Sequence, residues 1–326
     1  MSAPLRFVTS PLSRPAADAT LVVDGVVKRY GALTAVDHVS FTARPGRILG
    51  VLGPNGAGKT STIRMITGIT LPDEGRITVG GVPVGAETQA RMGYLPEERG
   101  LYRKLRVGEQ LVYFAELRGL DRADARRRTA YWLDRLGIAD WAGRRTEELS
   151  KGMQQKLQFV MTVLHDPDLL VFDEPFSGLD PINAELLRDI VLELRTAGRT
   201  ILFASHRMEQ VERLCDDLAL IARGRLVLGG TLAEVKGGFG RDVVHLAFDG
   251  PSTFLDRLAA SGGVRLVERG PGTAEVQLTG ATARDVLDAA LSEVAELTRF
   301  ELAQPSLQEI FVRTVGADAQ PASPVA

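Results

Sequence analysis

The sequence has almost no cysteine and no long apolar run. Cys215 is the only cysteine among 326 residues, which excludes an intrachain disulfide and a thiolate metal cluster and fits a reducing compartment. The longest apolar candidate, FVMTVL at 159–164, stops at His165, far short of the roughly 18 residues that a membrane-spanning helix needs. The formal net charge is −2, so the chain lacks the basic excess typical of nucleic-acid-binding proteins.

What remains is an ordinary globular composition, with 44% hydrophobic and 25% charged residues. Residues 1–19 are rich in Ala, Ser and Pro and carry only a weak apolar stretch, so we expect a disordered lead-in rather than a signal peptide. Residues 316–326 are expected to form a disordered tail. Between them we expect two domains, 20–235 and 241–315, because the pattern changes near KGGFG at 236–240.

The region 20–235 alternates short apolar runs with longer amphipathic segments. Four runs have the continuous hydrophobicity of strands buried on both faces of a parallel sheet. These runs lie at 48–53, 169–172, 201–205 and 218–222, after a shorter apolar run at 21–23. The segments expected to form helices lie at 108–118, 122–136, 153–165 and 183–197. Strands that alternate with helices predict an α/β fold.

The region 241–315 has a different pattern. The segments DVVHLAF, VRLVE, AEVQL and LTRFELA are typical of strands, and helices are expected at 252–261, 281–292 and 306–314. This combination predicts a small α+β domain.

A phosphate-binding loop is predicted at 53–60. The segment GPNGAGKT fits G-x-x-x-x-G-K-[ST], follows the apolar run ILGVL and precedes the helical segment TSTIRMITGI. Its glycines allow successive backbone N–H groups to face phosphate oxygens at a helix N-terminus. Lys59 is expected to reach the β- and γ-phosphates of ATP, and the Thr60 hydroxyl to ligate Mg²⁺. The predicted ATP contacts in this loop are Gly53, Pro54, Asn55, Gly56, Ala57, Gly58, Lys59, Thr60 and Ser61.

A carboxylate pair ends another apolar run, in LLVFDEP at 169–175. Asp173 is expected to hold the Mg²⁺ hydration shell. Glu174 beside it is expected to accept a proton from the attacking water. These two motifs alone serve kinases, GTPases and motors alike, so they do not decide the function.

Three further segments narrow the choice among these classes of protein. LSKGMQQK at 149–156 lies about twenty residues before DEP, and SGLD at 177–180 and ASHRME at 204–209 follow it. In this order and spacing, residues 20–235 resemble the ATP-binding subunit of an ABC transporter. The resemblance implies a P-loop NTPase fold with a helical signature subdomain.

Two other segments point to a subgroup of that family. GYLPEERGLY at 93–102 and PSLQEIFVRTVG at 305–316 are similar to segments of the ATPases that pair with ABC-2-type permeases in sodium and antibiotic export. The resemblance therefore implies a separate ABC-2-type permease as partner.

The resemblance also assigns residues to the chain's own ATP site. Tyr30 would stack on the adenine. His206 would lie near the γ-phosphate and hold the attacking water in line with Glu174. Glu97 stands where the family usually has Gln, in a loop that senses nucleotide and permease. A glutamate there still offers an oxygen to Mg²⁺ but adds negative charge, and Glu98 leaves the assignment open by one residue.

Other residues would act across a dimer. Ser150 suits a helix N-cap, and with Gly152 it would contact the ATP of a second subunit. Asp180 would belong to the loop that links the two ATP sites. The family's Leu-Ser-Gly-Gly-Gln reads differently here, with Lys151 and Met153 in place of the first Gly and the Gln, and Lys151 is an extra candidate phosphate contact.

The resemblance implies an ATPase that uses ATP and Mg²⁺ and pairs with itself or a related subunit. It would lie peripherally at the cytoplasmic face of the membrane and power export of a sodium ion, a drug or an antibiotic-like solute. Residues about 97–108 would form much of the docking groove for a permease helix. No nucleic-acid partner is expected.

Three alternatives stay open at this point. The first is a soluble ABC-type ATPase that acts on DNA or ribosomes, although the chain has neither a second cassette nor a long coiled-coil insertion. The second is a P-loop kinase or GTPase, which would leave LSKGMQQK and SGLD unexplained. The third is a regulatory subunit that binds ATP without turnover, which Glu174 disfavours and Glu97 permits.

Overall fold

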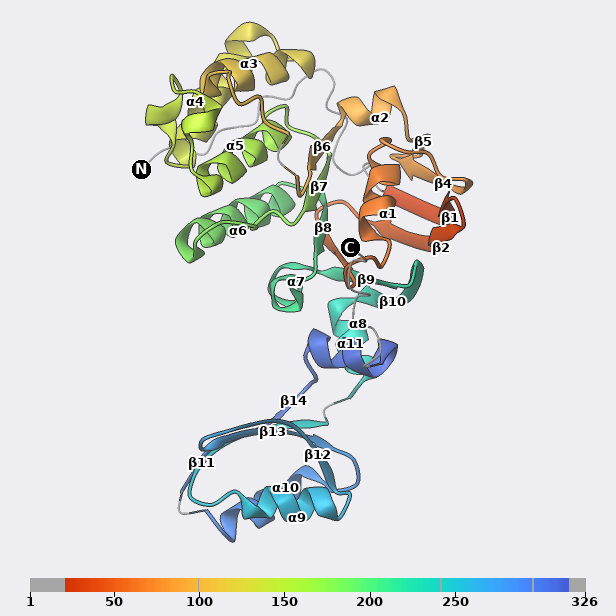
Figure 1. Cartoon of the computed structure of the whole chain (residues 1–326), viewed down its shortest axis with the longest axis vertical. Helices are drawn as coiled ribbons and strands as arrows, with labels where there is room; N and C mark the ends of the chain where they lie inside the picture. Colours follow the sequence, from red (N-terminus) through yellow and green to blue (C-terminus); the bar gives the residue numbers. More distant parts are fainter. Residues whose placement is uncertain (1–20, 99, 241, 295, 317–326) are drawn as a thin grey trace. The chain divides into compact units, whose positions relative to one another are not determined.

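A computed structural model describes residues 21–98, 100–240, 242–294 and 296–316 (Figure 1). The chain divides into two compact units, and the division falls between Gly230 and Thr231. The predicted lead-in at 1–19 and residues 317–326 of the predicted tail lie outside the described residues. The predicted limits of the two domains stay predictions.

The first unit is built on a six-stranded sheet of order β10-β9-β3-β8-β7-β6. Its strands are β3 (Ile48–Leu52), β6 (Met92–Leu95), β7 (Leu169–Asp173), β8 (Thr200–Ser205), β9 (Asp217–Ala222) and β10 (Arg225–Thr231). The strands from β9 through β3, β8 and β7 to β6 run parallel. All residues of β3, β7, β8 and β9 are buried. The four predicted two-face-buried strands are therefore confirmed.

A second sheet of order β2-β1-β4-β5 is antiparallel. It consists of β1 (Leu21–Tyr30), β2 (Leu33–Ala43), β4 (Glu74–Val79) and β5 (Val82–Pro83). Of these, only the start of β1 was predicted. Residues in β2 and β4 alternate between buried and exposed, so neither strand contains a continuous apolar run.

Alternate residues of the parallel strands face two different layers. Val171 joins a core with α1 (Lys59–Ile66) and the antiparallel sheet. The neighbouring Phe172 stacks on Phe159 of α5 (Lys151–Val163), with ring centroids 5.4 Å apart. Figure 1 shows α1 on one side of the sheet and α5 and α6 (Pro181–Thr196) on the other. The parallel sheet is thus covered on both faces, as its hydrophobic strands require.

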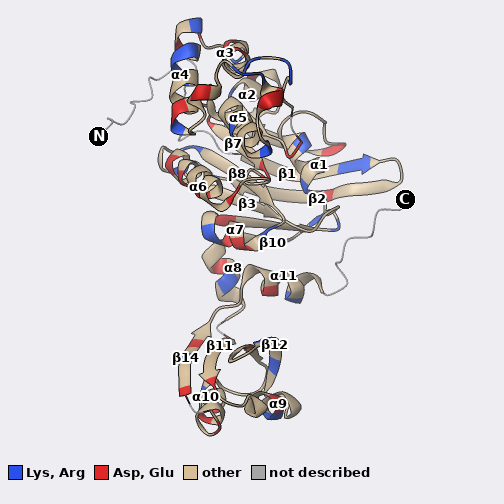
Figure 2. Ribbon diagram, turned by 60° about the vertical axis from the view of Figure 1, so that its left-hand side comes forward, with Lys and Arg blue, Asp and Glu red and all other residues tan. Residues whose placement is uncertain are grey.

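The predicted helices of this unit are present within about two residues of their expected limits. Their bounds are α3 (Val107–Leu117), α4 (Arg122–Arg135), α5 (Lys151–Val163) and α6 (Pro181–Thr196), with the shorter α2 (Ala86–Ala90) and α7 (Met208–Leu214) in addition. Two 3₁₀ turns occupy Ala139–Trp141 and Thr146–Glu148. Charges of both signs lie along α4 (Figure 2), where Arg127 pairs with Asp124 at 2.7 Å.

The second unit has the βαββαβ order of a ferredoxin-like fold. Its elements are α8 (Leu232–Gly238), β11 (Val243–Asp249), α9 (Thr253–Ala260), β12 (Val264–Gly270), β13 (Thr273–Leu278), α10 (Ala283–Leu291), β14 (Glu296–Ala303) and α11 (Leu307–Val315). The antiparallel sheet has the order β12-β13-β11-β14. Its core includes Phe248 and Phe254, whose ring centroids lie 5.4 Å apart. The predicted α+β pattern is confirmed. Within the described residues, no helix has both the length and the apolar character to cross a membrane.

Candidate functional site

The loop between β3 and α1 has a backbone that requires glycine. Gly53 has φ 152°, and an added Cβ would lie 2.1 Å from the carbonyl oxygen of Ile221. Gly58 has φ 107°, and its Cβ would lie 2.5 Å from the carbonyl oxygen of Ala35. Any larger residue would push the loop outward, away from the neighbouring strands. The helix α1 then begins at Lys59, so its free N–H groups face the loop.

Lys59 lies over this loop. Its Nζ donates to the carbonyl oxygens of Gly53 at 2.6 Å and of Pro54 at 3.0 Å. Burial lowers the pKa of Lys59, while Glu174, Asp173 and Glu97 act in the opposite direction. The ammonium is therefore the positive centre of an otherwise acidic site.

A pocket of about 290 Å³ opens at the carboxyl ends of the parallel strands. It brings together the phosphate loop, the strand-end carboxylates and two ring side chains that lie far apart in the sequence. The lining residues are Tyr30, Leu33, Ala35, Asn55, Gly56, Ala57, Gly58, Lys59, Thr60, Ser61, Glu97, Asp173, Glu174 and His206. Of the residues predicted for the chain's own ATP site, Gly53 and Pro54 are not in this lining and contact Lys59 instead.

Three carboxylates share this pocket. Asp173 is buried, and its burial together with Glu97 and Glu174 raises its pKa to about 6, against the opposing effect of Lys59. Carboxylate and hydroxyl oxygens such as those of Asp173, Glu97 and Thr60 are ligands that Mg²⁺ accepts. No group of three or more His, Cys, Asp or Glu residues in the described part of the chain is arranged to hold a metal alone. Magnesium ions at phosphate sites usually complete their coordination with waters and phosphate oxygens.

Glu174 is held in a strained conformation at the end of β7. Its φ is 50°, uncommon for a residue with a side chain, and its N–H donates to the carbonyl of Ala204 at 3.0 Å. One carboxylate oxygen accepts from Ser205 Oγ at 3.0 Å. The other lies 2.7 Å from both the backbone N and the ring Nδ1 of His206. Together these contacts hold the carboxylate in one orientation beside the pocket.

Tyr30 ends β1 at the rim of the pocket. Its side chain is 45% exposed, and Lys28 Nζ lies 5.7 Å from the centre of its ring. An exposed aromatic ring at the rim is available to stack on a base.

The residues predicted to act across a dimer lie outside this pocket. Ser150 caps α5, and its Oγ accepts from the N–H of Met153 at 3.3 Å, as the cap pattern predicted. An added Cβ at Gly152 would lie 3.5 Å from the carbonyl oxygen of Gly178, so the start of α5 lies beside the SGLD loop. Asp180 caps α6 by accepting from the N–H of Asn183 at 3.0 Å. Ser150, Gly152 and Asp180 therefore lie close to one another but do not line the chain's own phosphate pocket.

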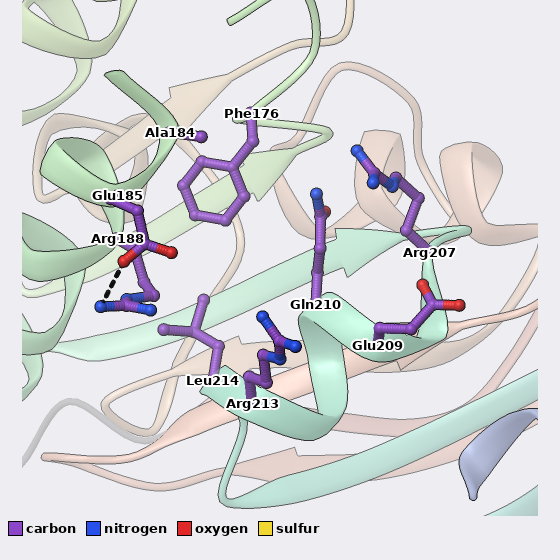
Figure 3. Close-up of a pocket in the computed structure, with 9 residues that line it drawn as sticks. All are labelled: Phe176, Ala184, Glu185, Arg188, Arg207, Glu209, Gln210, Arg213 and Leu214. Atoms are coloured by element: carbon purple, nitrogen blue, oxygen red, sulfur yellow. Dashed lines mark ion pairs between the residues drawn. The ribbon is translucent and has the colours of Figure 1, made fainter. Parts of the chain in front are cut away.

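A second pocket, of about 390 Å³, lies between α6 and α7 (Figure 3). Figure 3 shows Gln210 and Arg213 rising from α7 and Phe176 reaching in from the loop after β7. Gln210 Oε1 is 3.4 Å from Ser205 Oγ, the hydroxyl that also contacts Glu174. Neither Ser205 nor Gln210 was predicted from the sequence as a site residue. The only local indication for Ser205 is its position directly before His206 in ASHRME.

Comparisons with known proteins agree with this geometry. A family model described as ABC transporter matches residues 36–177, and one described as ATP-binding protein DrrA1-3-like, C-terminal domain, matches 230–315. The chain is 43% identical over 297 residues to the uncharacterized ABC transporter ATP-binding protein YhaQ of Bacillus subtilis (strain 168), which covers 91% of this chain and 99% of that protein.

Two further similarities extend this result. The chain is 35% identical over 307 residues to Nod factor export ATP-binding protein I of Paraburkholderia xenovorans (strain LB400), which covers 93% of this chain and 99% of that protein. A solved structure of the ATP-binding subunit of an ABC transporter superposes with a TM-score of 0.64 at 33% identity, over 68% of this chain and 93% of that one. The predicted family and fold are confirmed, and a kinase or GTPase is excluded. The chain belongs to the ATP-binding subunits of ABC transporters, a family of enzymes that hydrolyse ATP.

Proposed function

We propose that two copies of this chain, or one copy and a related ATPase subunit, close on two molecules of ATP with Mg²⁺ and so drive export through a separate ABC-2-type permease. One observation carries the proposal. The pocket holds a phosphate loop and an oriented carboxylate, while Ser150, Gly152 and Asp180 lie together outside it. The site of one chain is then completed by the helix start of another, and closure depends on the γ-phosphate.

Each residue of the pocket has a role in this proposal. Backbone N–H groups of 53–61 and the Lys59 ammonium bind the phosphates, and Tyr30 stacks on the adenine. Thr60, Asp173 and Glu97 hold Mg²⁺, directly or through its waters. The metal's chemistry is to neutralise charge that develops on the phosphate oxygens.

Glu174 is the proposed base for hydrolysis. Its carboxylate accepts hydrogen bonds from Ser205 Oγ and from the His206 backbone N–H, which hold it in one orientation for taking a proton from water. If the His206 ring donates through Nδ1 to this carboxylate, the other ring nitrogen is left for the water or the γ-phosphate.

The permease partner is inferred from exposed side chains and from the relatives. Tyr102 is 56% exposed and Leu105 39% exposed, both within the 97–108 segment proposed to form the docking groove. The relative named for Nod factor export favours export as the direction. The solute we propose is a sodium ion, a drug or an antibiotic-like molecule. The chain would lie peripherally at the cytoplasmic face of the membrane, without a nucleic-acid partner.

The alternative is an ABC-type ATPase that acts outside transport, on DNA or ribosomes. Co-purification distinguishes the two functions. If a tagged full-length chain expressed in its own host retains a protein with several apolar spans, transport is supported. Retention of ribosomal RNA or DNA after a salt wash would favour the alternative.

The central test of the proposal is Glu174→Gln in the full chain. The amide keeps the shape of the side chain but cannot take a proton, so we expect Mg²⁺-dependent ATP turnover to fall by about 10²–10⁴-fold. ATP should still bind, and dimers should accumulate on a sizing column in the presence of ATP. Glu87→Gln, at an exposed position on α2, is the matched control. Unchanged turnover would refute the role of Glu174, and a monomer with bound ATP would refute dimer closure.

A further inference from the structure

A buried amide on α5 holds the backbone on both sides of Glu97. Gln158 is 4% exposed, and its Nε2 donates to the carbonyl oxygens of Pro96 and Glu98, each at 3.1 Å. An amide NH₂ group has two hydrogens, so each carbonyl takes one. The two acceptors also fix the orientation of the amide, because the flipped form would place its oxygen against both carbonyls.

The same helix is packed against the strand that leads to Glu97. Thr162 Oγ1 lies 3.3 Å from the carbonyl oxygen of Tyr94. An added Cβ at Gly93 would lie 2.3 Å from the carbonyl oxygen of Thr162, so glycine permits this close approach of β6 to α5. The strand end before Glu97 is therefore positioned by α5.

The chain after Glu97 is bound to the segment that leads into α5. The N–H of Thr146 donates to the carbonyl of Leu105, and the N–H of Glu147 to the carbonyl of Arg103, both at 3.0 Å. Ser150, at the start of α5, comes three positions after Glu147 in the sequence. The 97–108 segment and the start of α5 are thus joined by backbone hydrogen bonds, and Gln158 joins the same helix to the pocket at Glu97.

A contribution to stability alone does not explain why residue 158 is a glutamine. Its Oε1 is buried and has no hydrogen-bond partner among the described residues. A buried acceptor without a partner offsets much of the gain from the two bonds of the NH₂ group. A side chain of similar size without polar atoms would have no unpaired acceptor, but it would leave the carbonyls of Pro96 and Glu98 without this donor. What the amide adds over such a side chain is the link to the loop that carries these two carbonyls.

From these contacts we infer that Gln158 is a positioning residue for Glu97, through which α5 sets the placement of this carboxylate in the ATP pocket. The inference rests on the proposed function, in which Glu97 faces Mg²⁺ and the start of α5 contacts the ATP of a second subunit. Movement of the docking segment or of α5 then changes the metal site through one side chain.

The test replaces Gln158 with Met, which has a similar volume and no donor. Gln89→Met is the matched control, because Gln89 Nε2 likewise donates to the backbone, to the carbonyl oxygen of Thr67 at 3.0 Å, and Gln89 does not line the pocket. In the full chain we expect Gln158→Met to lower kcat about tenfold and to raise the Mg²⁺ concentration for half-maximal activity about fivefold. Hydrogen exchange in peptides that cover 97–105 should become faster. Gln89→Met should change none of these.

A double-mutant cycle with Glu97→Ala, which removes the side-chain oxygen that would face Mg²⁺, separates positioning from general destabilisation. If Gln158 acts through Glu97, Gln158→Met should have little further effect on Mg²⁺ dependence in the Glu97→Ala background. Additive effects, or hydrogen exchange at 97–105 equal to that of Gln89→Met, would overturn the inference. The ATP-dependent dimer of Glu174→Gln, measured in parallel, reports on the proposed function itself. If Glu174→Gln forms an ATP-dependent dimer but the effects of the substitutions at Gln158 and Glu97 are additive, only the role of Gln158 is refuted.

Discussion

Glu174 and His206 are joined at two points, because one carboxylate oxygen lies 2.7 Å from the backbone N and 2.7 Å from the ring Nδ1 of the histidine. The two residues directly follow the neighbouring parallel strands β7 and β8 and are 32 positions apart in the sequence. Only the backbone contact survives removal of the ring. The two contributions can therefore be separated experimentally.

His206→Ala removes the ring and keeps the backbone N–H. We expect kcat to fall by about 10²-fold, with ATP affinity within about threefold of the unmodified chain, because the lost contact orients the base rather than the nucleotide. Steady-state ATPase assays and binding of a fluorescent ATP analogue measure the two quantities. A kcat within twofold of the unmodified chain would show that the ring is not needed.

Tyr30→Ala removes the exposed ring at the rim of the pocket. Stacking on a base contributes about 1–3 kcal/mol, so ATP should bind about tenfold more weakly while kcat at saturation stays nearly constant. Tyr113→Ala, at a ring that is 50% exposed and does not line the pocket, serves as the control. Equal affinities for the two variants would contradict the stacking role.

The raised pKa of Asp173 predicts a pH dependence of stability in the nucleotide-free protein. Because the folded-state pKa is about 6 and the ordinary value is 3.8, the folded state binds this proton more tightly. Its contribution to the free energy of unfolding is fully present below about pH 4 and is lost as pH rises through about 6. The lost stability amounts to roughly 3 kcal/mol at most.

Urea unfolding between pH 4 and 7 measures this effect, with Asp173→Asn as the comparison. The Asn variant should lose less stability over this range than the unmodified chain, since it has no proton to release. Parallel pH profiles for the two proteins would argue against a raised pKa at Asp173.

Asp168 is predicted to be an important charge for the stability of the parallel sheet. It is 4% exposed, and its carboxylate accepts from Arg91 and from Arg199, at 2.5 and 3.2 Å. Asp168→Ala would leave two partly buried guanidiniums with one acceptor fewer each, at a cost of about 3–5 kcal/mol. The pair of Asp124 and Arg127, whose side chains are 28% and 55% exposed, offers the matched change, and Asp124→Ala should cost less than about 1 kcal/mol. Similar losses for both variants in urea unfolding would contradict the prediction.

The strands and the phosphate loop were predictable because their signals are local. β7 and β8 are buried on both faces, so their residues form uninterrupted apolar runs. The loop at 53–60 must bring backbone N–H groups to phosphate, and only a glycine-rich segment before a helix does so. By contrast, β2 is half exposed, and its polar residues hide the strand from any search for apolar runs.

The amino-acid sequence alone determined the family, the α/β fold class and the phosphate-loop motif, because each of these depends on neighbours within one strand, loop or helix. Only the tertiary structure decided how those residues are held. The hydroxyl of Ser205 on Glu174 and the amide of Gln158 on the carbonyls around Glu97 join positions 31 and 60 to 62 residues apart. Such contacts arise from the packing of strands and helices against one another, and no local pattern of residues encodes them.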